Sequence, residues 1–212
     1  MKRVIAIIIC IVLIPSFVCA ADIYQSEADK LNALGLFKGT EKGYELNRSF
    51  TRAEGAVMLT RLLGVKKEAL AFQSEKPLSD VDGHWAESYV MYCYDNKITK
   101  GTGGNTFSPE DIMTGKEYIT LILRSLGYEN VNPDNAYIAA AEYSLLSSGK
   151  LREILDGVFT RNKMVYVSYN ALKVKDKEGE ALVNRLISQK VLPKSVAEEY
   201  NLINNSNEYV TK

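Results

Sequence analysis

The chain has 212 residues, and its 26 lysines and arginines balance its 26 aspartates and glutamates, so the formal net charge is zero. A hydrophobic content of 46% is typical of a folded globular protein and excludes a disordered chain. The lack of a basic excess argues against a nucleic-acid-binding protein.

The first twenty residues have the pattern of a secretory signal. Lys2 and Arg3 precede an apolar run over residues 4–14, which is too short to span a bilayer comfortably. Val18 and Ala20 then stand where signal peptidase requires small residues. We therefore expect a signal peptide over 1–20. Its removal takes away two cations and leaves 192 residues with a net charge of −2 and no membrane span.

Two of the three cysteines, Cys10 and Cys19, lie in this signal, so no intrachain disulfide can form in the mature chain. A secreted chain of this size without disulfides suits a bacterium. Cys93 falls inside a predicted helix and is expected to be an inert buried thiol. A lipid attached at Cys19 is the alternative to simple cleavage, but residues 16–18 lack the Leu-small-small pattern of such sites.

The mature chain repeats itself. Residues 51–54 resemble residues 114–117 at an offset of 63, and residues 159–162 match 50–53 at an offset of 109. Each copy is predicted to contain a helix, a glycine stop, an irregular loop and a second helix. The expected boundaries are 21–64, 78–127 and 136–175, followed by a helical and polar extension over 176–212, which is too short for a second ordinary domain.

The second helices of the first two copies carry a capping-box pattern. Thr51 and Glu54 in the first copy, and Thr114 and Glu117 in the second, should each satisfy a backbone donor at the helix start. Apolar residues then recur at helical spacing until Gly64 and Gly127, where the helices should end. The linkers between copies are residues 65–78 and 129–135.

The first helix of the second copy is expected to begin near His84 and Trp85 and to end by Gly101. Trp85, Tyr89 and Tyr92 would share one face, so Trp85 is predicted to pack in the core. Asp80 and Asp82 precede this helix and are predicted to cap it.

The third copy is weaker than the others. Gly149 is its expected helix stop, and Lys163 replaces the capping glutamate, which should weaken the helix that begins at Thr160. Beyond residues 175–179, a helix is predicted over 180–190, followed by a mobile tail ending at 204–206.

Arg52 and Arg161 would each occupy the first position of a helix, where the macrodipole disfavours a cation by ~0.3 to 1 kcal/mol. An anion held between the guanidinium and the free amides of the first turn would compensate for this cost. The alternative is that both arginines are solvated surface residues. In the second copy Gly115 replaces the arginine and Lys116 is displaced by one residue, so bidentate geometry is lost there.

The second copy resembles one complete S-layer homology repeat in the order and spacing of five segments: 79–86, 98–101, 107–109, 114–117 and 126–127. The first copy is similar from Lys38 and Gly39 onward, but Ile23 falls where Trp85 would be. The third copy keeps only fragments. The resemblance covers residues 21–175.

This resemblance implies an all-α fold in which three repeats pack as a pseudo-threefold helical prism. It also implies a secreted protein of the bacterial cell surface, held non-covalently on the wall, with no catalytic activity and no cofactor. The expected ligand is an anionic secondary cell-wall polysaccharide, often carrying pyruvate ketals, bound in grooves between repeats. The protein would anchor itself or a partner such as another surface protein. The expected polymer-binding residues are Thr51, Arg52, Asp80, Trp85, Lys116, Thr160 and Arg161. For Trp85, stacking on a sugar is the alternative to packing in the core. For Asp80, accepting hydrogen bonds from sugar hydroxyls is the alternative to capping the helix. The groove around Arg52 ranks first and that around Arg161 second.

Other chemistries find little support. A single histidine, His84, and no Cys-x-x-Cys pair argue against a metal site. The glycine-rich segment 101–104 lacks the ending of a phosphate-binding loop and follows a predicted helix, which favours a turn. No pair of carboxylates is marked out for glycoside hydrolysis. A protein-interaction or scaffold role, in which the repeats have lost polymer binding, remains the main alternative, and an enzyme comes third.

Overall fold

The computed structural model describes residues 23–203, so the predicted signal peptide and the tail at 204–206 lie outside the described residues. These described residues form ten helices and no β-sheet, which confirms the predicted all-α class. The helices are α1 Gln25–Ala33, α2 Arg52–Leu62, α3 Lys66–Ala71, α4 Glu87–Asp95, α5 Gly115–Ser125, α6 Ala136–Glu142, α7 Ser148–Leu155, α8 Arg161–Ala171, α9 Leu182–Ser188 and α10 Lys194–Glu199.

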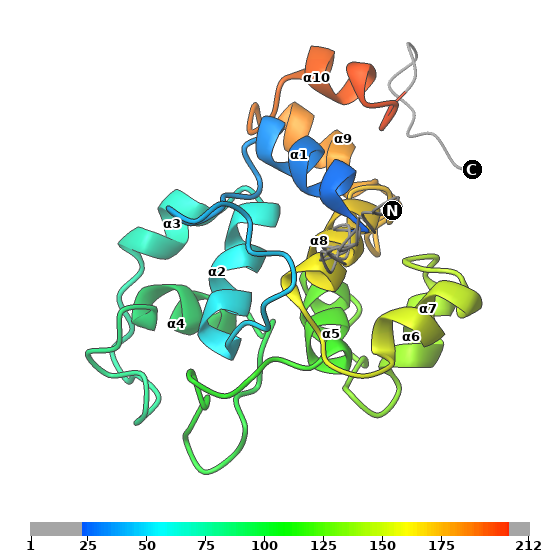
Figure 1. Cartoon of the computed structure of the whole chain (residues 1–212). Helices are drawn as coiled ribbons and strands as arrows, with labels where there is room; N and C mark the ends of the chain where they lie inside the picture. The colour runs from blue at the N-terminus through cyan, green and yellow to red at the C-terminus, as the bar shows by residue number, and fades with distance from the viewer. Residues whose placement is uncertain (1–22, 204–212) are drawn as a thin grey trace, which may run out of the picture.

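Helices α2, α5 and α8 form the inner set, and a helix from another unit covers each of them. α4 packs on α2, α6 packs on α5, and α1 packs on α8. Because α1 opens the described chain and α8 lies far along it, this last contact closes the three helix–loop–helix units into a ring (Figure 1). The ring is the predicted pseudo-threefold prism.

The centre of the prism is built by the residues that precede the three inner helices. Phe50, Met113 and Phe159 each stand directly before the threonine at a helix start, and all three are buried. The rings of Phe50 and Phe159 lie 5.6 Å apart, and each lies within 6 Å of the buried Tyr118 ring. The Met113 amide donates to the Phe50 carbonyl at 3.0 Å. Equivalent sequence positions therefore meet in one apolar cluster, as a threefold arrangement requires.

Both predicted capping boxes are formed. The Thr51 hydroxyl accepts from the Glu54 amide, and the Glu54 carboxylate accepts from the Thr51 amide at 2.9 Å. Thr114 and Glu117 repeat this geometry. Thr160 makes no such side-chain cap, as the lysine three residues later predicts. Because each cap satisfies otherwise orphaned helix-terminal donors, the first two inner helices are pinned more firmly at their starts than the third.

Several predicted boundaries are wrong. The first helix of the second copy begins at Glu87 and not near Trp85, because the carboxylate of Glu87 accepts from the Gly83 amide at 2.8 Å and closes the preceding turn. Gly149 does not stop a helix but lies inside α7. The left-handed residue that follows α6 is Ser144, with φ of 57°.

The segments between and after the copies are also more ordered than the sequence predicts. The linker 65–78 contains α3, and α10 follows the predicted extension helix, which is shortened to α9. The polar stretch before α9 is a turn around Asp176, whose carboxylate accepts from the Glu178 and Glu180 amides and from Arg185. Asp176 is buried, so this turn belongs to the folded domain.

Replacement of Gly115 by alanine is expected to lower the free energy of unfolding by about 1–2 kcal/mol. A β-carbon at Gly115 would lie 2.8 Å from Leu155 Cδ2 and 3.1 Å from the ring of Phe159, which already packs in the core. Gly149→Ala is the matched control, because nothing lies within 4 Å of its β-carbon position and the backbone there is helical. Its stability should be unchanged or raised by about 0.5 kcal/mol. Urea unfolding followed by circular dichroism measures both, and equal stability of the two variants would contradict the packing described.

Candidate functional site

Arg161 begins α8 and is docked onto the loop that precedes α2. Its amide donates to the Arg48 carbonyl at 2.9 Å, and its Nε donates to the Tyr44 carbonyl at 2.8 Å. The guanidinium carbon lies 5.2 Å from the centre of the Phe37 ring. These contacts hold the stem of the side chain in place.

Arg161 makes no ion pair with any carboxylate in the part of the chain that the structure describes. Burial lowers its pKa, and the nearby positive charge of Arg48 lowers it further, which outweighs the opposite effect of Glu54 and Glu45. A lowered arginine pKa means that the surroundings disfavour the cation. An anion arriving here would be attracted by a positive charge that the protein itself does not neutralise.

Arg52 begins α2, and its side chain makes an internal ion pair that Arg161 lacks among the described residues. Its Nε donates to the Phe107 carbonyl at 2.8 Å, and its guanidinium lies over the Phe107 ring and pairs with the carboxylate of Glu117. Only 7% of the side chain is exposed. The sequence ranks Arg52 as the first polymer-binding residue, and in the structure its charge has an internal partner, which Arg161 lacks among the described residues.

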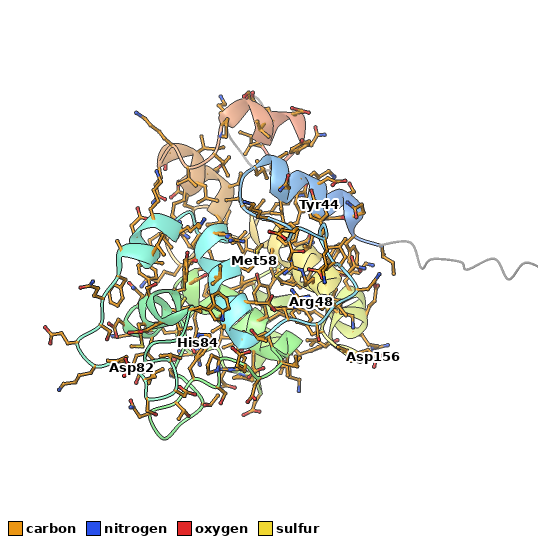
Figure 2. All side chains as sticks on the ribbon, turned by 60° about the vertical axis from the view of Figure 1, so that its left-hand side comes forward. Tyr44, Arg48, Met58, Asp82, His84 and Asp156 are labelled. Atoms are coloured by element: carbon orange, nitrogen blue, oxygen red, sulfur yellow. The ribbon has the colours of Figure 1, made fainter. Side chains whose placement is uncertain are left out.

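Arg161 lines a groove of about 190 Å³. This volume is below the ~300 Å³ at which drug-sized ligand pockets begin, so it suits a single small group such as one sugar residue with its substituent. Its walls come from all three units. The residues that line it include Lys38, Gly39, Glu54, Arg61, Trp85 and Arg161. Figure 2 shows Met58, which also lines the groove, on α2 between Arg48 and Tyr44 on one side and His84 on the other.

Trp85 corrects the prediction that it packs in the core. It is 60% exposed and forms part of the groove wall. The residue lies before α4 begins, so the helical periodicity that groups it with Tyr89 and Tyr92 does not apply to it. A flat indole in the wall of a small groove is suited to stacking on the C–H face of a sugar.

Gly39 shapes the bottom of the groove. A β-carbon at this position would come within 2.6 Å of the Gly43 carbonyl oxygen, so only glycine fits. Lys38 and Arg61 stand beside it, and with Arg161 they give the groove three cations against the single carboxylate of Glu54. Low-dielectric walls strengthen the attraction of such a surplus for an anion.

Glu54 is already engaged by a bidentate contact. Arg48 donates from both terminal nitrogens to the two carboxylate oxygens, at 2.8 and 3.0 Å. Burial alone would raise the pKa of Glu54, but the hydrogen bonds from Arg48 and from the Thr51 amide outweigh it, and the pKa lies below its usual value. Glu54 is therefore ionised at neutral pH, and its charge is compensated by Arg48.

The remaining predicted binding residues do not line this groove. Asp80 does not cap a helix, which corrects that expectation, because its carboxylate accepts from the Phe107 and Ser108 amides at 2.7–3.1 Å and fixes that loop. Asp82 does not cap α4 either. Thr51 and Thr160 lie at their helix starts outside the groove, and Lys116 is exposed beside Gly115, where Leu155 and Phe159 fill the space of an arginine.

Sequence reasoning missed two residues of the arrangement, Arg48 and Arg61. Arg61 had a signal, because it matches Arg124 at the repeat offset of 63. Arg48 had none, since the residue at the same offset is Asp111. Its role depends on a contact made through space.

Other chemistries have no visible centre in residues 23–203. No cluster of three or more metal-ligating side chains is present there, and none of the helices is long and apolar enough to cross a bilayer. Cys93 is buried as predicted, and desolvation raises its pKa to about 12, which disfavours the reactive thiolate. His84 contacts Glu110 at 2.8 Å.

Comparison with known proteins relates part of the chain to a known domain family. Residues 77–119 match the family model of the S-layer homology domain. The chain carries an S-layer homology domain. It is 31% identical over 130 residues to the middle cell wall protein of Brevibacillus brevis, 27% identical over 186 residues to a cell surface protein of Thermoanaerobacter kivui, and 30% identical over 93 residues to a cellulosome-anchoring protein of Acetivibrio thermocellus.

These matches cover 58%, 85% and 43% of this S-layer homology domain protein. They cover only 12%, 24% and 19% of the relatives, so the chain spans a small part of the length of each. The domain and the surface-protein relatives support a location at the bacterial cell surface.

Proposed function

We propose that this S-layer homology domain protein attaches to the bacterial cell wall by binding an anionic secondary wall polysaccharide in the groove at Arg161. The single observation that carries the proposal is the position of Arg161, which lines a groove with a surplus of cations and has no ion pair within the described residues. The similarity to a cellulosome-anchoring protein supports an anchoring role.

The chemistry of the groove supports a charged sugar as the bound unit. Arg161 can grip a carboxylate, such as that of a pyruvate ketal, with two parallel hydrogen bonds. Trp85 offers an aromatic face within the same groove, and Lys38 adds a second cation. Together these groups suit a ligand that has one anionic substituent and one apolar ring face.

We further infer that the repeats extend over 21–64, 78–127 and 136–175, and that the extension 176–212 is attached to the third. This inference is supported by the recurrence of one inner and one covering helix in each unit. The role proposed for these repeats is binding, which the relatives named as a cell surface protein and a cellulosome-anchoring protein support.

Retention on purified wall sacculi is expected to depend on the anionic polymer. The protein should co-sediment with intact sacculi and stay in solution after acid extraction of the polymer, and retention should weaken as salt is raised. Because Trp85 is the single tryptophan of the chain, its emission should shift when the extracted polymer is added. Equal retention on stripped sacculi, with no emission change, would contradict polymer binding and favour a protein partner.

A further inference from the structure

The junctions that hold Arg52 and Arg161 have the same backbone geometry. The Arg161 amide donates to the carbonyl of Arg48, and the Arg52 amide donates to the carbonyl of Asp111, both at 2.9 Å. The next amide in each helix donates two residues farther back, to Leu46 and Pro109 respectively. Residues 48 and 111 are also separated by the repeat offset of 63, so they occupy equivalent places.

The side chains of the two arginines continue this equivalence. Each Nε donates to a backbone carbonyl at 2.8 Å. The acceptor is the carbonyl of Tyr44 for Arg161 and the carbonyl of Phe107 for Arg52. These two acceptors are again 63 residues apart. The stems of both arginines are thus held in the same way, and the difference between the junctions lies in the carboxylates around them.

The capping glutamate is the group that changes partner. At the Arg52 junction, Glu117 pairs with Arg52. At the Arg161 junction, the equivalent Glu54 pairs bidentately with Arg48 and makes no ion pair with Arg161. At the Arg52 junction, the position equivalent to Arg48 is occupied by Asp111. Because Asp111 is an acid, it cannot form an ion pair with Glu117, and Glu117 pairs with Arg52.

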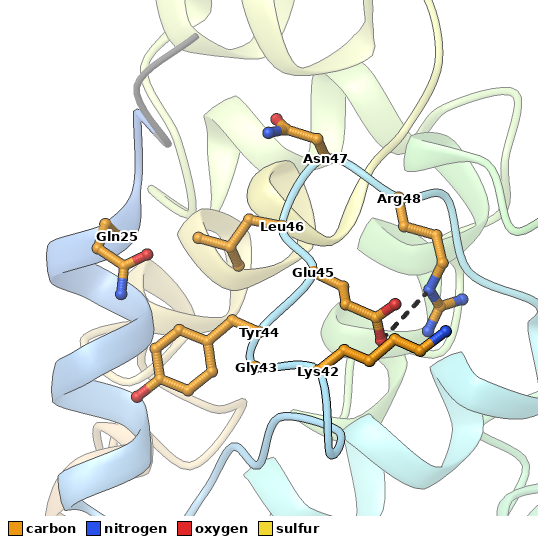
Figure 3. Close-up of a pocket in the computed structure, with 8 residues that line it drawn as sticks. All are labelled: Gln25, Lys42, Gly43, Tyr44, Glu45, Leu46, Asn47 and Arg48. Atoms are coloured by element: carbon orange, nitrogen blue, oxygen red, sulfur yellow. Dashed lines mark ion pairs between the residues drawn. The ribbon is translucent and has the colours of Figure 1, made fainter. Parts of the chain in front are cut away.

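Arg48 is well placed to hold this glutamate. It belongs to the loop before α2, and Figure 3 shows its side chain extending on the same side of the loop as Lys42 and Glu45, with Tyr44 and Leu46 on the other side. It also contacts Glu45 at 3.9 Å and donates to the Ser49 carbonyl at 2.9 Å. Arg48 is not among the residues that line the groove, so it acts on the groove through Glu54.

We propose that Arg48 is a positioning residue for anion binding, which holds Glu54 and so keeps the charge of Arg161 available to a negatively charged ligand. The proposal rests on the proposed function. It adds that the Arg48–Glu54 ion pair determines which of the two junctions binds the anionic polymer. Arg161 occupies the place equivalent to Arg52 but has no ion pair with the capping glutamate, because Glu54 pairs with Arg48.

The test combines Arg48→Ala with Glu54→Gln, and the readout is the affinity for extracted wall polymer measured by Trp85 emission. Arg48→Ala should release Glu54 to pair with Arg161 and weaken binding about tenfold, the scale of one charge-assisted contact. Arg48→Ala/Glu54→Gln should bind within about twofold of the wild type. Glutamine retains the carbonyl oxygen that the capping box requires, so the helix start is kept.

A matched control separates this mechanism from a general charge effect. Arg48→Ala/Glu45→Gln removes the same charge from a neighbouring acid, whose carboxylate accepts from the Thr40 hydroxyl at 2.6 Å. This variant should stay about as weak as Arg48→Ala. Thermal melts of all variants show that each is folded.

The outcomes distinguish the two proposals. If the wild type does not bind the polymer, the proposed function is wrong. If the wild type binds and Arg161→Ala does not, but Arg48→Ala binds normally, the role of Arg48 is wrong while polymer binding stands. Loss of binding in Arg48→Ala that Glu54→Gln does not restore, or that Glu45→Gln restores equally, would also overturn the positioning role.

Discussion

Arg161→Ala is expected to lose retention on wall sacculi, with the affinity for extracted polymer falling at least about tenfold. Removal of the guanidinium deletes the buried member of the three groove cations, none of which has an ion pair among the described residues. Hydrogen bonds to a charged group contribute ~1.5–3 kcal/mol, which corresponds to this loss. Arg161→Lys should recover only part of the affinity, because a point charge cannot reproduce bidentate geometry.

The control for Arg161→Ala is Arg152→Ala, which removes one positive charge from the exposed surface of α7. Its retention should equal that of the wild type. Circular dichroism checks that both variants fold, since Arg161 also packs over Phe37. Wild-type affinity in a folded Arg161→Ala protein would refute the assignment of this groove.

Arg52→Ala is expected to act on stability and not on wall binding. The substitution leaves the Glu117 carboxylate without its partner and removes the hydrogen bond to the Phe107 carbonyl. Breaking a fully buried ion pair costs ~3–5 kcal/mol, and the 26% exposure of Glu117 reduces this, so the free energy of unfolding should fall by about 2 kcal/mol. Urea unfolding measures the change.

Arg48→Ala provides the comparison for stability. Its pair with Glu54 is more exposed, with 39% of the Arg48 side chain accessible, so its loss should cost less than about 1 kcal/mol.

Polymer affinity of the folded Arg52→Ala protein should match the wild type. If Arg52→Ala instead lost much of its polymer affinity while its stability was unchanged, Arg52 would be the main polymer-binding residue, as the sequence predicts.

Local sequence signals predicted the secondary structure where the chemistry is local. Thr51 with Glu54, and Thr114 with Glu117, mark helix starts because the hydrogen bonds of a cap join residues only three positions apart. Gly64 and Gly127 adopt the left-handed backbone that ends the same helices. The covering helices were harder, because Ser144 and Lys97 take the left-handed conformation without being glycine.

Side-chain exposure was predicted less well than helix positions. Trp85 has an aromatic neighbour at helical spacing, yet it precedes the helix and is exposed, so periodicity assigns it to the wrong environment. Asp80 has the residue type of a helix cap, but its carboxylate binds the amides of Phe107 and Ser108. Trp85 is misplaced because the helix begins after it, and Asp80 because its partners lie 27 and 28 positions away in the sequence.

The sequence by itself determined the repeats, the helical class and the presence of two arginines at helix starts, because these depend on residue type and short spacing. Only the tertiary structure decided which of these arginines has an ion pair within the described residues. Arg52 and Glu117 are 65 positions apart, and Glu54 is taken by Arg48 at a position where the other junction has Asp111. Coulombic pairing depends on distances in space, and those distances are set only when the three units close into a ring.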